Sequence, residues 1–166
     1  MASIGPLIVG IEENEPERVL VEAARLASDF GTELVCAHVD TSRYPVDEHE
    51  DGSVTSMPLD PEIPDIRDEV VSPELEAFVR AALEDWSVSL RFVALAGDTA
   101  QALGELAERL DARAIVVGTR RPGFRAGLEK FFTGSVAVRL AHRQKRPVIV
   151  VPVEPHEAAA PWEFEG

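Results

Sequence analysis

The sequence predicts an α/β fold in which a doubly wound, five-stranded parallel sheet carries helices on both faces. Short apolar runs such as PLIVGI alternate with longer segments in which apolar residues recur every three or four positions. A short continuous apolar run is typical of a strand that is buried on both faces, and apolar residues at every third or fourth position are typical of an amphipathic helix. The resulting order, β-α-β-(loop)-α-β-α-β-α-β, joins the strands by right-handed crossovers and is typical of Rossmann-like domains.

Five segments have the apolar run that is expected of a buried strand. They are rich in Val, Ile and Leu, and Gly, Pro or polar residues bound them. The strands are expected at Pro6–Ile11, Glu33–Val39, Ser89–Ala96, Ala114–Val117 and Pro147–Val151.

Four amphipathic helices are expected between these strands. Asn14 is the expected N-cap of the first helix, with Pro16 in its first turn, and Gly31 ends it. Ser72 followed by Pro73 is a typical start for the second helix, because proline fits the first helical position. The other two helices are expected to begin at Asp98 and Ser135, and the last to end near Arg143.

We divide the chain into one α/β domain, residues 1–153, and an acidic tail, residues 154–166. Within the domain, residues 40–71 are rich in Asp, Glu and Pro and show no sustained periodicity. We interpret this segment as a long, partly mobile, acidic loop excursion. The acids at its centre lack the spacing of an EF-hand, so that we predict no metal site at Asp47, Glu48, Glu50 and Asp51.

The net charge of −14 argues against general binding of nucleic acid, because phosphate contacts need basic side chains. Half of the 16 Lys and Arg residues nevertheless lie between Arg120 and Arg146. No apolar stretch approaches the roughly 18 residues of a membrane span. The first residues do not have the basic region of a signal peptide, so we expect a cytoplasmic protein. The single cysteine, Cys36, lies in an apolar strand pattern and is expected to be a buried core residue.

Residues 115–152 have the clearest pattern for a ligand site. A buried strand ends at Gly118, a basic loop with further glycines follows, and Thr133-Gly134-Ser135 opens the last helix. Together a strand, a glycine loop and a helix N-terminus make a natural phosphate cradle, because unpaired N–H groups and the helix dipole point at one spot. In doubly wound sheets, ligands bind beyond the carboxyl ends of the strands, where the strand order reverses. The sequence therefore predicts an anion site at this edge of the sheet.

The chain resembles the universal stress protein family over nearly its whole length. The segments that carry the resemblance are LIVGIEENEPERVLVEAARLA, ELVCAHV, AGDTAQALGELAERLDARAIVVGTR and TGSVAVRLAHRQKRPVIVVP. The resemblance implies the strand order 3-2-1-4-5, in which the first and fourth strands are neighbours at the reversal.

The last long loop matches the family's nucleotide-binding members at its ends and departs from them in its middle. In those members the loop carries a glycine, a second glycine shortly after it, and then a Gly-Ser or Gly-Thr pair. Gly118 matches the first glycine and Gly134-Ser135 matches the pair. Arg121 stands where the second glycine would fall, and the loop is longer than the family's pattern.

A second departure follows the first strand, where nucleotide-binding members usually have Asp, then Gly and Ser. This chain has Glu12, Glu13 and Asn14. Carboxylates near a polyphosphate oppose its binding unless a cation bridges them. The resemblance implies ATP or another adenine nucleotide as the ligand, with Mg²⁺ only alongside it. The implied contacts are Ile11, Glu12 and Val39 for adenine, and Gly118, Thr119, Arg120, Gly134, Ser135 and the Val136 amide for the phosphates.

The sequence leaves three functions open. The first is a small regulatory stress-response protein that binds rather than catalyses, because no pattern pairs a nucleophile with a base. The second is a slow, Mg²⁺-dependent ATPase in which Glu12 or Glu13 positions a metal-bound water. The third is an interaction module that binds no nucleotide and whose basic loop, residues 120–130, docks an acidic partner.

The fifth predicted strand has features that favour association with a second chain. Its segment Val148–Val151 is apolar throughout and is expected at the edge of the sheet, where an uncovered strand invites pairing with another chain. Pro147 and Pro152 bracket the segment and limit the length of that pairing. The family often forms homodimers through this strand, so the resemblance implies a homodimer. From the net charge and the lack of a long apolar stretch, we expect neither nucleic acid nor a membrane as partner.

Overall fold

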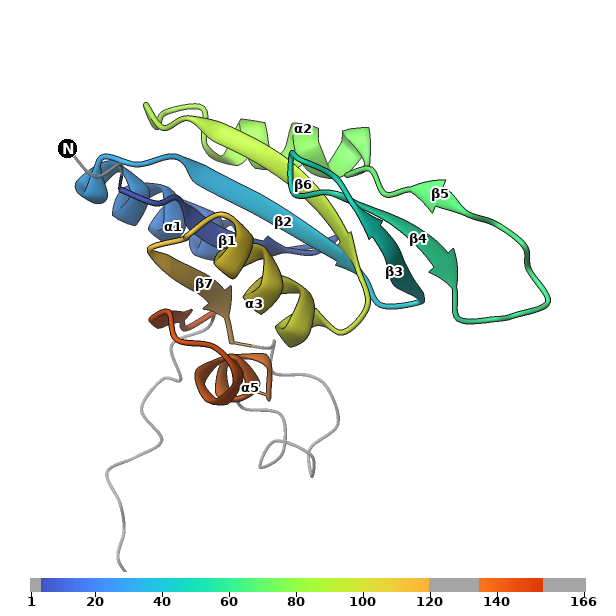
Figure 1. Ribbon diagram of the computed structural model, residues 1–166. Helices are drawn as coiled ribbons and strands as arrows, with labels where there is room; N and C mark the ends of the chain where they lie inside the picture. The colour runs from blue at the N-terminus through green and yellow to red at the C-terminus, as the bar shows by residue number, and fades with distance from the viewer. Residues whose placement is uncertain (1–3, 120–134, 154–166) are drawn as a thin grey trace, which may run out of the picture.

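The computed structural model describes residues 4–119 and 135–153, and its centre is a five-stranded sheet (Figure 1). The strand order is β6-β2-β1-β7-β8, and each neighbouring pair is parallel. Counted along the chain, this is the order 3-2-1-4-5, so the predicted doubly wound sheet is confirmed. The strands are β1 (Leu7–Ile11), β2 (Leu34–Asp40), β6 (Leu90–Ala96), β7 (Ala114–Gly118) and β8 (Val148–Val151).

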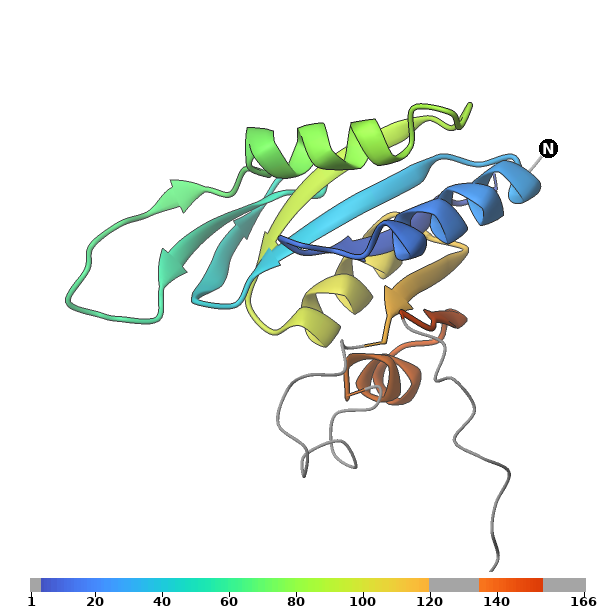
Figure 2. The same cartoon turned by 180° about the vertical axis from the view of Figure 1, so that it is seen from behind.

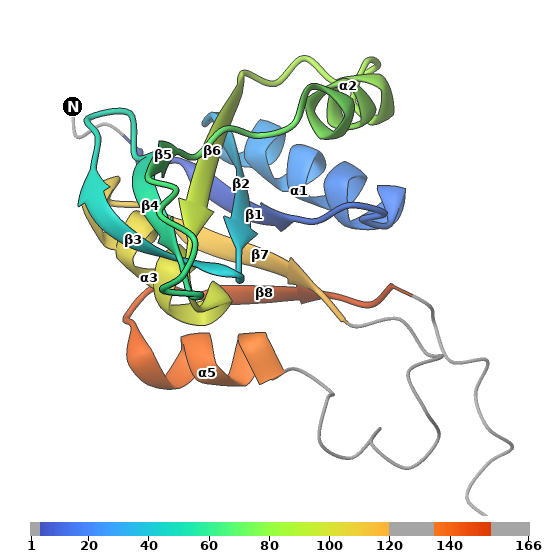
Figure 3. The same ribbon diagram turned by 90° about the vertical axis from the view of Figure 1, so that its right-hand side faces the viewer.

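Helices cover both faces of this sheet (Figures 2 and 3). Those on the first face are α1 (Glu17–Phe30) and α2 (Pro73–Ala82), and those on the second are α3 (Thr99–Arg109) and α5 (Ser135–Arg143). Along β1, Leu7 and Val9 join the core cluster beneath α1, whereas Ile8 joins the cluster beneath α3. Burial on both faces explains why this strand reads as a continuous apolar run. None of the helices in the described part of the chain is long and apolar enough to cross a membrane.

Residues 40–71 contain a second sheet, which is antiparallel and has the strand order β3-β4-β5. Its strands are β3 (Arg43–Glu48), β4 (Val54–Pro58) and β5 (Arg67–Asp68). The interpretation of this segment as an irregular loop excursion is therefore wrong. Val54 is buried in the cluster beneath α3, and Arg109 of α3 donates a 3.0 Å hydrogen bond to the Gly52 carbonyl. The turn between β3 and β4 is thus anchored on the main domain, beside β6 (Figure 3).

Charged side chains hold this small sheet together from within. The Arg43 side chain is 5% exposed; its Nε donates to Ser56 Oγ at 2.6 Å and lies 3.0 Å from Glu69 Oε1. Arg67 Nε lies 3.3 Å from the same Glu69 oxygen. On its other side, Arg43 Nη1 donates to Asp65 Oδ2 at 3.1 Å. Buried charges are tolerated only when they are paired and hydrogen-bonded, so each of these groups depends on the others.

The helix starts follow the sequence pattern at α2 and α3 but not at α1. Ser72 and Asp98 accept hydrogen bonds of 3.2 and 3.0 Å from backbone amides of α2 and α3, which confirms both N-caps. The prediction for Asn14 is wrong, because Pro16 occupies the N-cap position of α1. Asn14 has a φ of 65° instead, a left-handed conformation that asparagine tolerates better than most residues.

Cys36 is a buried residue of β2, as predicted. Burial raises the pKa of its thiol to about 12. The thiolate is the reactive form of cysteine, so this side chain is a core residue and not a nucleophile.

Candidate functional site

The predicted ligand site lies at the carboxyl ends of β1 and β7, where the strand order reverses. β1 pairs with β2 on one side and with β7 on the other. The helices that follow β1 and β7 in the chain, α1 and α5, lie on opposite faces of the sheet. Ligands of doubly wound sheets bind in the crevice at such a reversal. The predicted site residues at the carboxyl ends of the strands are Ile11, Glu12, Val39, Gly118 and Thr119. Arg120 and Gly134 lie outside the described residues.

A tight turn with three carboxylates follows β1. The Glu15 amide donates to the Glu12 carbonyl at 3.0 Å, and Asn14 takes its left-handed conformation at the third position of the turn. Glu12 and Glu13 are exposed, whereas Glu15 is half-buried. Sequence reasoning did not identify Glu15 as a site residue. The signal was the asparagine before it, because Asn tolerates the left-handed conformation that this turn has at its third position.

Gly118 is the point at which the β1–α1 turn, β7 and the residues after β8 converge. A Cβ atom at this position would lie 2.8 Å from Val19 Cγ2, 3.2 Å from Val153 Cγ2 and 3.4 Å from Glu15 Oε1. Two methyl groups and a carboxylate oxygen therefore pack directly over this glycine. A glycine is needed here because of this close approach.

Thr119 links the end of β7 by hydrogen bonds to the end of β8 and the residues after it. Its amide donates to the Val151 carbonyl at 3.0 Å, and its hydroxyl oxygen accepts a 2.9 Å hydrogen bond from the Val153 amide. These two groups are thus already engaged within the protein. The hydroxyl proton of Thr119 is the group that could still donate a hydrogen bond to a ligand.

His38 joins the carboxyl ends of β1 and β2. Its Nδ1 lies 3.1 Å from the Ile11 carbonyl oxygen, so the ring donates a proton from Nδ1 to that oxygen. Ile11 itself is buried, and Val39, the next residue of β2, is half-buried. Of these two apolar residues, only Val39 is therefore accessible beside the acidic turn.

An ion pair joins α5 to the N-cap of α3. Ser135 and Val136 begin α5, and Val136 packs against the cluster beneath α3. One turn later, Arg139 Nη2 lies 2.7 Å from Asp98 Oδ1. Burial alone would raise the pKa of Asp98, but the hydrogen bond from an α3 amide and the Arg139 guanidinium outweigh burial and lower that pKa. Asp98 therefore stays ionised and holds the start of α5 near the edge of the sheet.

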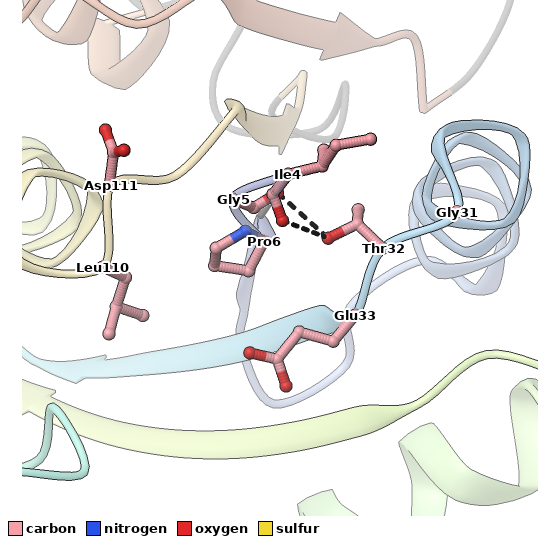
Figure 4. Close-up of a pocket in the computed structure, with 8 residues that line it drawn as sticks. All are labelled: Ile4, Gly5, Pro6, Gly31, Thr32, Glu33, Leu110 and Asp111. Atoms are coloured by element: carbon pink, nitrogen blue, oxygen red, sulfur yellow. Dashed lines mark hydrogen bonds between the residues drawn. The ribbon is translucent and has the colours of Figure 1, made fainter. Parts of the chain in front are cut away.

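The described residues form a pocket at the opposite, amino-terminal edge of the sheet, with a volume of about 430 Å³ (Figure 4). Its carboxylates are already paired: Glu33 with Arg91 at 2.7 Å and Asp111 with Arg146 at 3.3 Å. None of the predicted site residues lines it. Within residues 4–119 and 135–153, no group of three or more His, Cys, Asp or Glu side chains is placed to hold a metal ion.

Several solved structures share this fold. A universal stress protein from Archaeoglobus fulgidus aligns with a TM-score of 0.59 and 20% identity, covering 89% of this chain and 98% of its own. A universal stress protein in complex with cAMP gives 0.57 and 18%, covering 92% of this chain and 100% of its own. The Archaeoglobus fulgidus protein in complex with dAMP gives 0.56 and 19%, covering 90% and 98%. No curated protein sequence matches the chain.

The sequence model of the universal stress protein family matches residues 4–152. This span includes every strand and helix in the described part of the chain. The resemblance seen in the sequence is thereby confirmed, and the chain belongs to the universal stress protein family.

Proposed function

We propose that this universal stress protein acts in the cytoplasm as a regulator that binds an adenine nucleotide at the carboxyl ends of β1 and β7. The observations that carry the proposal are the close approach of the β1–α1 turn to Gly118 at the reversal of strand order, and the start of α5 at the end of the sheet where β7 and β8 end (Figure 3). A helix N-terminus at such a point suits a phosphate, because its amides and dipole favour an anion. Two proteins of the same fold are described in complex with cAMP and dAMP, which supports the same class of ligand.

In this proposal the adenine base lies near Ile11, Glu12 and Val39 and packs against the half-buried Val39 side chain. The phosphates extend from Gly118 and the Thr119 hydroxyl toward the start of α5. The remaining phosphate contacts that we propose are Arg120, Gly134, Ser135 and the amide of Val136. Mg²⁺ enters only with the phosphates, and the exposed carboxylates of Glu12 and Glu13 are oxygen ligands of the kind that this ion accepts.

The test is to titrate the purified protein with AMP, cAMP and ATP by isothermal calorimetry, after mass spectrometry for co-purified nucleotide. Val39→Glu puts a charge into the adenine position and is expected to weaken binding at least about tenfold, or roughly 1.4 kcal/mol. Thr41→Glu is the matched control, because it adds the same charge two residues along at an exposed position. Absence of bound nucleotide and of any heat up to millimolar ligand would refute the proposal.

We further propose that the protein is a homodimer that pairs through β8. Among the described strands, β8 has a neighbour, β7, on one side only, and Val150 is 43% exposed. An uncovered apolar edge of this kind favours pairing with a second copy.

Val150→Arg is expected to convert the dimer to a monomer at micromolar concentration in sedimentation equilibrium. Val138→Arg is the matched control, because it makes the same replacement at an exposed position on α5 and is expected to leave the dimer intact. A wild-type protein that sediments as a monomer would contradict this proposal.

A further inference from the structure

The segment that holds the small antiparallel sheet carries most of the large apolar side chains that the described residues leave exposed. Of the ten such side chains in residues 4–119 and 135–153, six belong to this segment. They are Tyr44, Val46, Leu59, Ile63, Ile66 and Val70. β4, β5 and the loop between them also project beyond the end of the main sheet (Figure 1). Exposed apolar side chains that gather in one region of a protein mark an interaction site.

The small sheet has its polar side chains inside and its apolar side chains outside. Arg43, Ser56 and Glu69 are buried on the face that also carries Val54, which packs beneath α3. The residue after each of these three points to the other face, because side chains alternate along a strand. These outward residues are Tyr44, Met57 and Val70. A sheet that packs on a core with one face and meets water with the other has the reverse arrangement. The outer face therefore has the composition of a surface that becomes buried in a complex.

An apolar row crosses this outer face from β3 to β5. The register pairs Tyr44 with Met57, and the Tyr44 hydroxyl donates to Met57 Sδ at 3.6 Å. Ser56 pairs with Arg67, so Ile66, the residue before Arg67, continues the row beside Met57. Ile66 is 63% exposed. The row thus presents an aromatic ring, a thioether and an aliphatic side chain, and protein interfaces are enriched in aromatic residues and methionine.

An acidic row lies beside the apolar one on the same face. The register pairs Asp47 with Thr55, and Thr55 with Asp68. The Thr55 hydroxyl donates to Asp68 Oδ1 at 2.6 Å, and this hydrogen bond lowers the pKa of Asp68, with a smaller contribution from His49. His49 Nε2 lies 3.3 Å from the same Asp68 oxygen. Residues two apart in a strand are separated by about 7 Å, so the acidic row lies roughly that far from the apolar row.

The segment as a whole is strongly negative. From Asp40 to Val71 it contains ten Asp and Glu residues and two arginines. Both arginines already pair with carboxylates of the same segment, and Arg109 of α3 pairs with Glu48 at 2.9 Å. The basic residues 120–134 continue from β7, and β1 and β2 separate β7 from β6, beside which the small sheet lies. This excess of carboxylates favours a cationic partner and repels nucleic acid and anionic lipid.

We propose that the outer face of the small sheet docks a segment of another protein that carries lysine or arginine beside apolar side chains. The apolar side chains pack on Tyr44, Met57 and Ile66, and the cationic side chains reach Asp47 and Asp68. In an extended segment, residues two apart face the same side at a spacing of about 7 Å, which matches the two rows. None of these five residues belongs to the proposed nucleotide site, so this inference goes beyond that function and does not depend on it.

The test uses the full-length protein and a fluorescein-labelled peptide of about nine residues that repeats Arg-Ser-Val-Ser, which places Arg and Val on one side of an extended chain. Binding is measured by fluorescence anisotropy. Wild type is expected to bind this peptide at least about tenfold more tightly than a peptide with Glu in place of each Arg, because the surface is acidic. Raising the salt concentration is expected to weaken the binding, since exposed charges are screened.

Two pairs of variants assign the binding to the outer face. Ile66→Ser is expected to weaken the peptide at least about fivefold through lost apolar burial, and Val138→Ser, which removes an exposed apolar side chain from α5, less than about twofold. Asp68→Asn is expected to weaken it about threefold and to reduce its salt dependence. Asp29→Asn makes the same change of charge at an exposed position of α1 and is expected to leave the affinity unchanged. Midpoints of thermal unfolding close to that of wild type show that all four variants are folded.

The outcomes separate this inference from the proposed nucleotide binding. Ile66→Ser and Asp68→Asn are expected to bind AMP as wild type does, and a wild type that binds the peptide but no nucleotide leaves the inference standing. Equal peptide affinity in wild type, Ile66→Ser and Asp68→Asn refutes it. A protein that binds phosphatidylserine vesicles or duplex DNA instead of the peptide also refutes it. Self-association that Ile66→Ser abolishes, without peptide binding, makes a second copy the occupant and overturns the inference as well.

Discussion

Replacing Glu69 by alanine is expected to lower the free energy of unfolding by about 3 kcal/mol. The Glu69 side chain is 6% exposed and is the buried carboxylate that faces Arg43. Without it, a guanidinium that is itself 5% exposed loses its 3.0 Å partner, and Ser56 loses the acceptor of its hydroxyl proton. The remaining ionic partner, Asp65, is 47% exposed, so the buried guanidinium is left poorly compensated, and such a charge costs far more than an intact pair contributes. Urea unfolding followed by circular dichroism measures the loss.

Two variants show whether the loss comes from the orphaned charge. Asp65→Ala removes the other partner of Arg43, but Asp65 is 47% exposed, so we expect a loss below about 1 kcal/mol. Arg43→Met combined with Glu69→Leu removes both buried charges and is expected to be within about 1 kcal/mol of wild type, or more stable. A single Glu69→Ala variant that loses less than 1 kcal/mol would contradict the account of this small sheet.

The second large effect is expected at Gly5, just before β1. A Cβ on Gly5 would lie 1.8 Å from the Asp111 carbonyl oxygen, which belongs to the backbone and has little freedom to move. The Gly5 carbonyl accepts a 3.0 Å hydrogen bond from the Thr32 hydroxyl, and the Pro6 carbonyl accepts one of 2.9 Å from the Arg113 amide. Both of these hydrogen bonds break if the backbone at Gly5 moves away from the Asp111 carbonyl. We therefore expect Gly5→Ala to cost about 3 kcal/mol, at the upper end of overpacking effects.

Gly31→Ala is the matched control for this substitution. Gly31 has a φ of 65°, but a Cβ there would meet nothing within 4 Å. We expect Gly31→Ala to lower the free energy of unfolding by about 1 kcal/mol, the cost of placing an alanine in the left-handed backbone conformation. The midpoints of thermal and urea unfolding of the two variants then separate steric overlap from backbone strain. Equal losses in both would mean that the close approach at Gly5 does not constrain the fold.

The main sheet is predictable from sequence because its strands are buried on both faces. Val9 pairs with Cys36 on one side and with Val116 on the other, and all three are buried. Such central positions admit only apolar residues whichever face they point to, so the strand appears as an unbroken run. The helices are predictable for a related reason, since each buries one stripe against those strands.

The antiparallel sheet is hidden in the sequence because its inward positions are polar. Arg43, Ser56 and Glu69 are buried there, while Tyr44 is 41% exposed. Alternation of apolar and polar residues is the signal of a half-buried strand, and here the charged network removes it. Only the three-dimensional pairing of these groups turns an acidic, proline-containing segment into ordered strands.

The candidate site is predictable in place but not in its detailed contacts. Gly118 follows an apolar run and precedes a glycine-containing loop, so its position at the end of β7 could be predicted. That the Thr119 amide donates to Val151 depends on how β7 meets β8, which no local pattern encodes. The nearness of Glu15 to Gly118 depends in turn on the left-handed conformation of Asn14, a preference that sequence indicates only weakly.

The ion pair between Asp40 and Arg67 has a consequence for how this chain tolerates change in length. Asp40 ends β2, Arg67 begins β5, and Asp40 Oδ2 lies 3.3 Å from Arg67 Nη2, so the intervening segment leaves and rejoins the domain at nearly one point. The entropy of closing a loop grows only logarithmically, by about 0.6 kcal/mol for each doubling of its length. A change in the length of this segment therefore adds little to the entropy of closing it, as long as Arg67 and the contact of Val54 beneath α3 are kept.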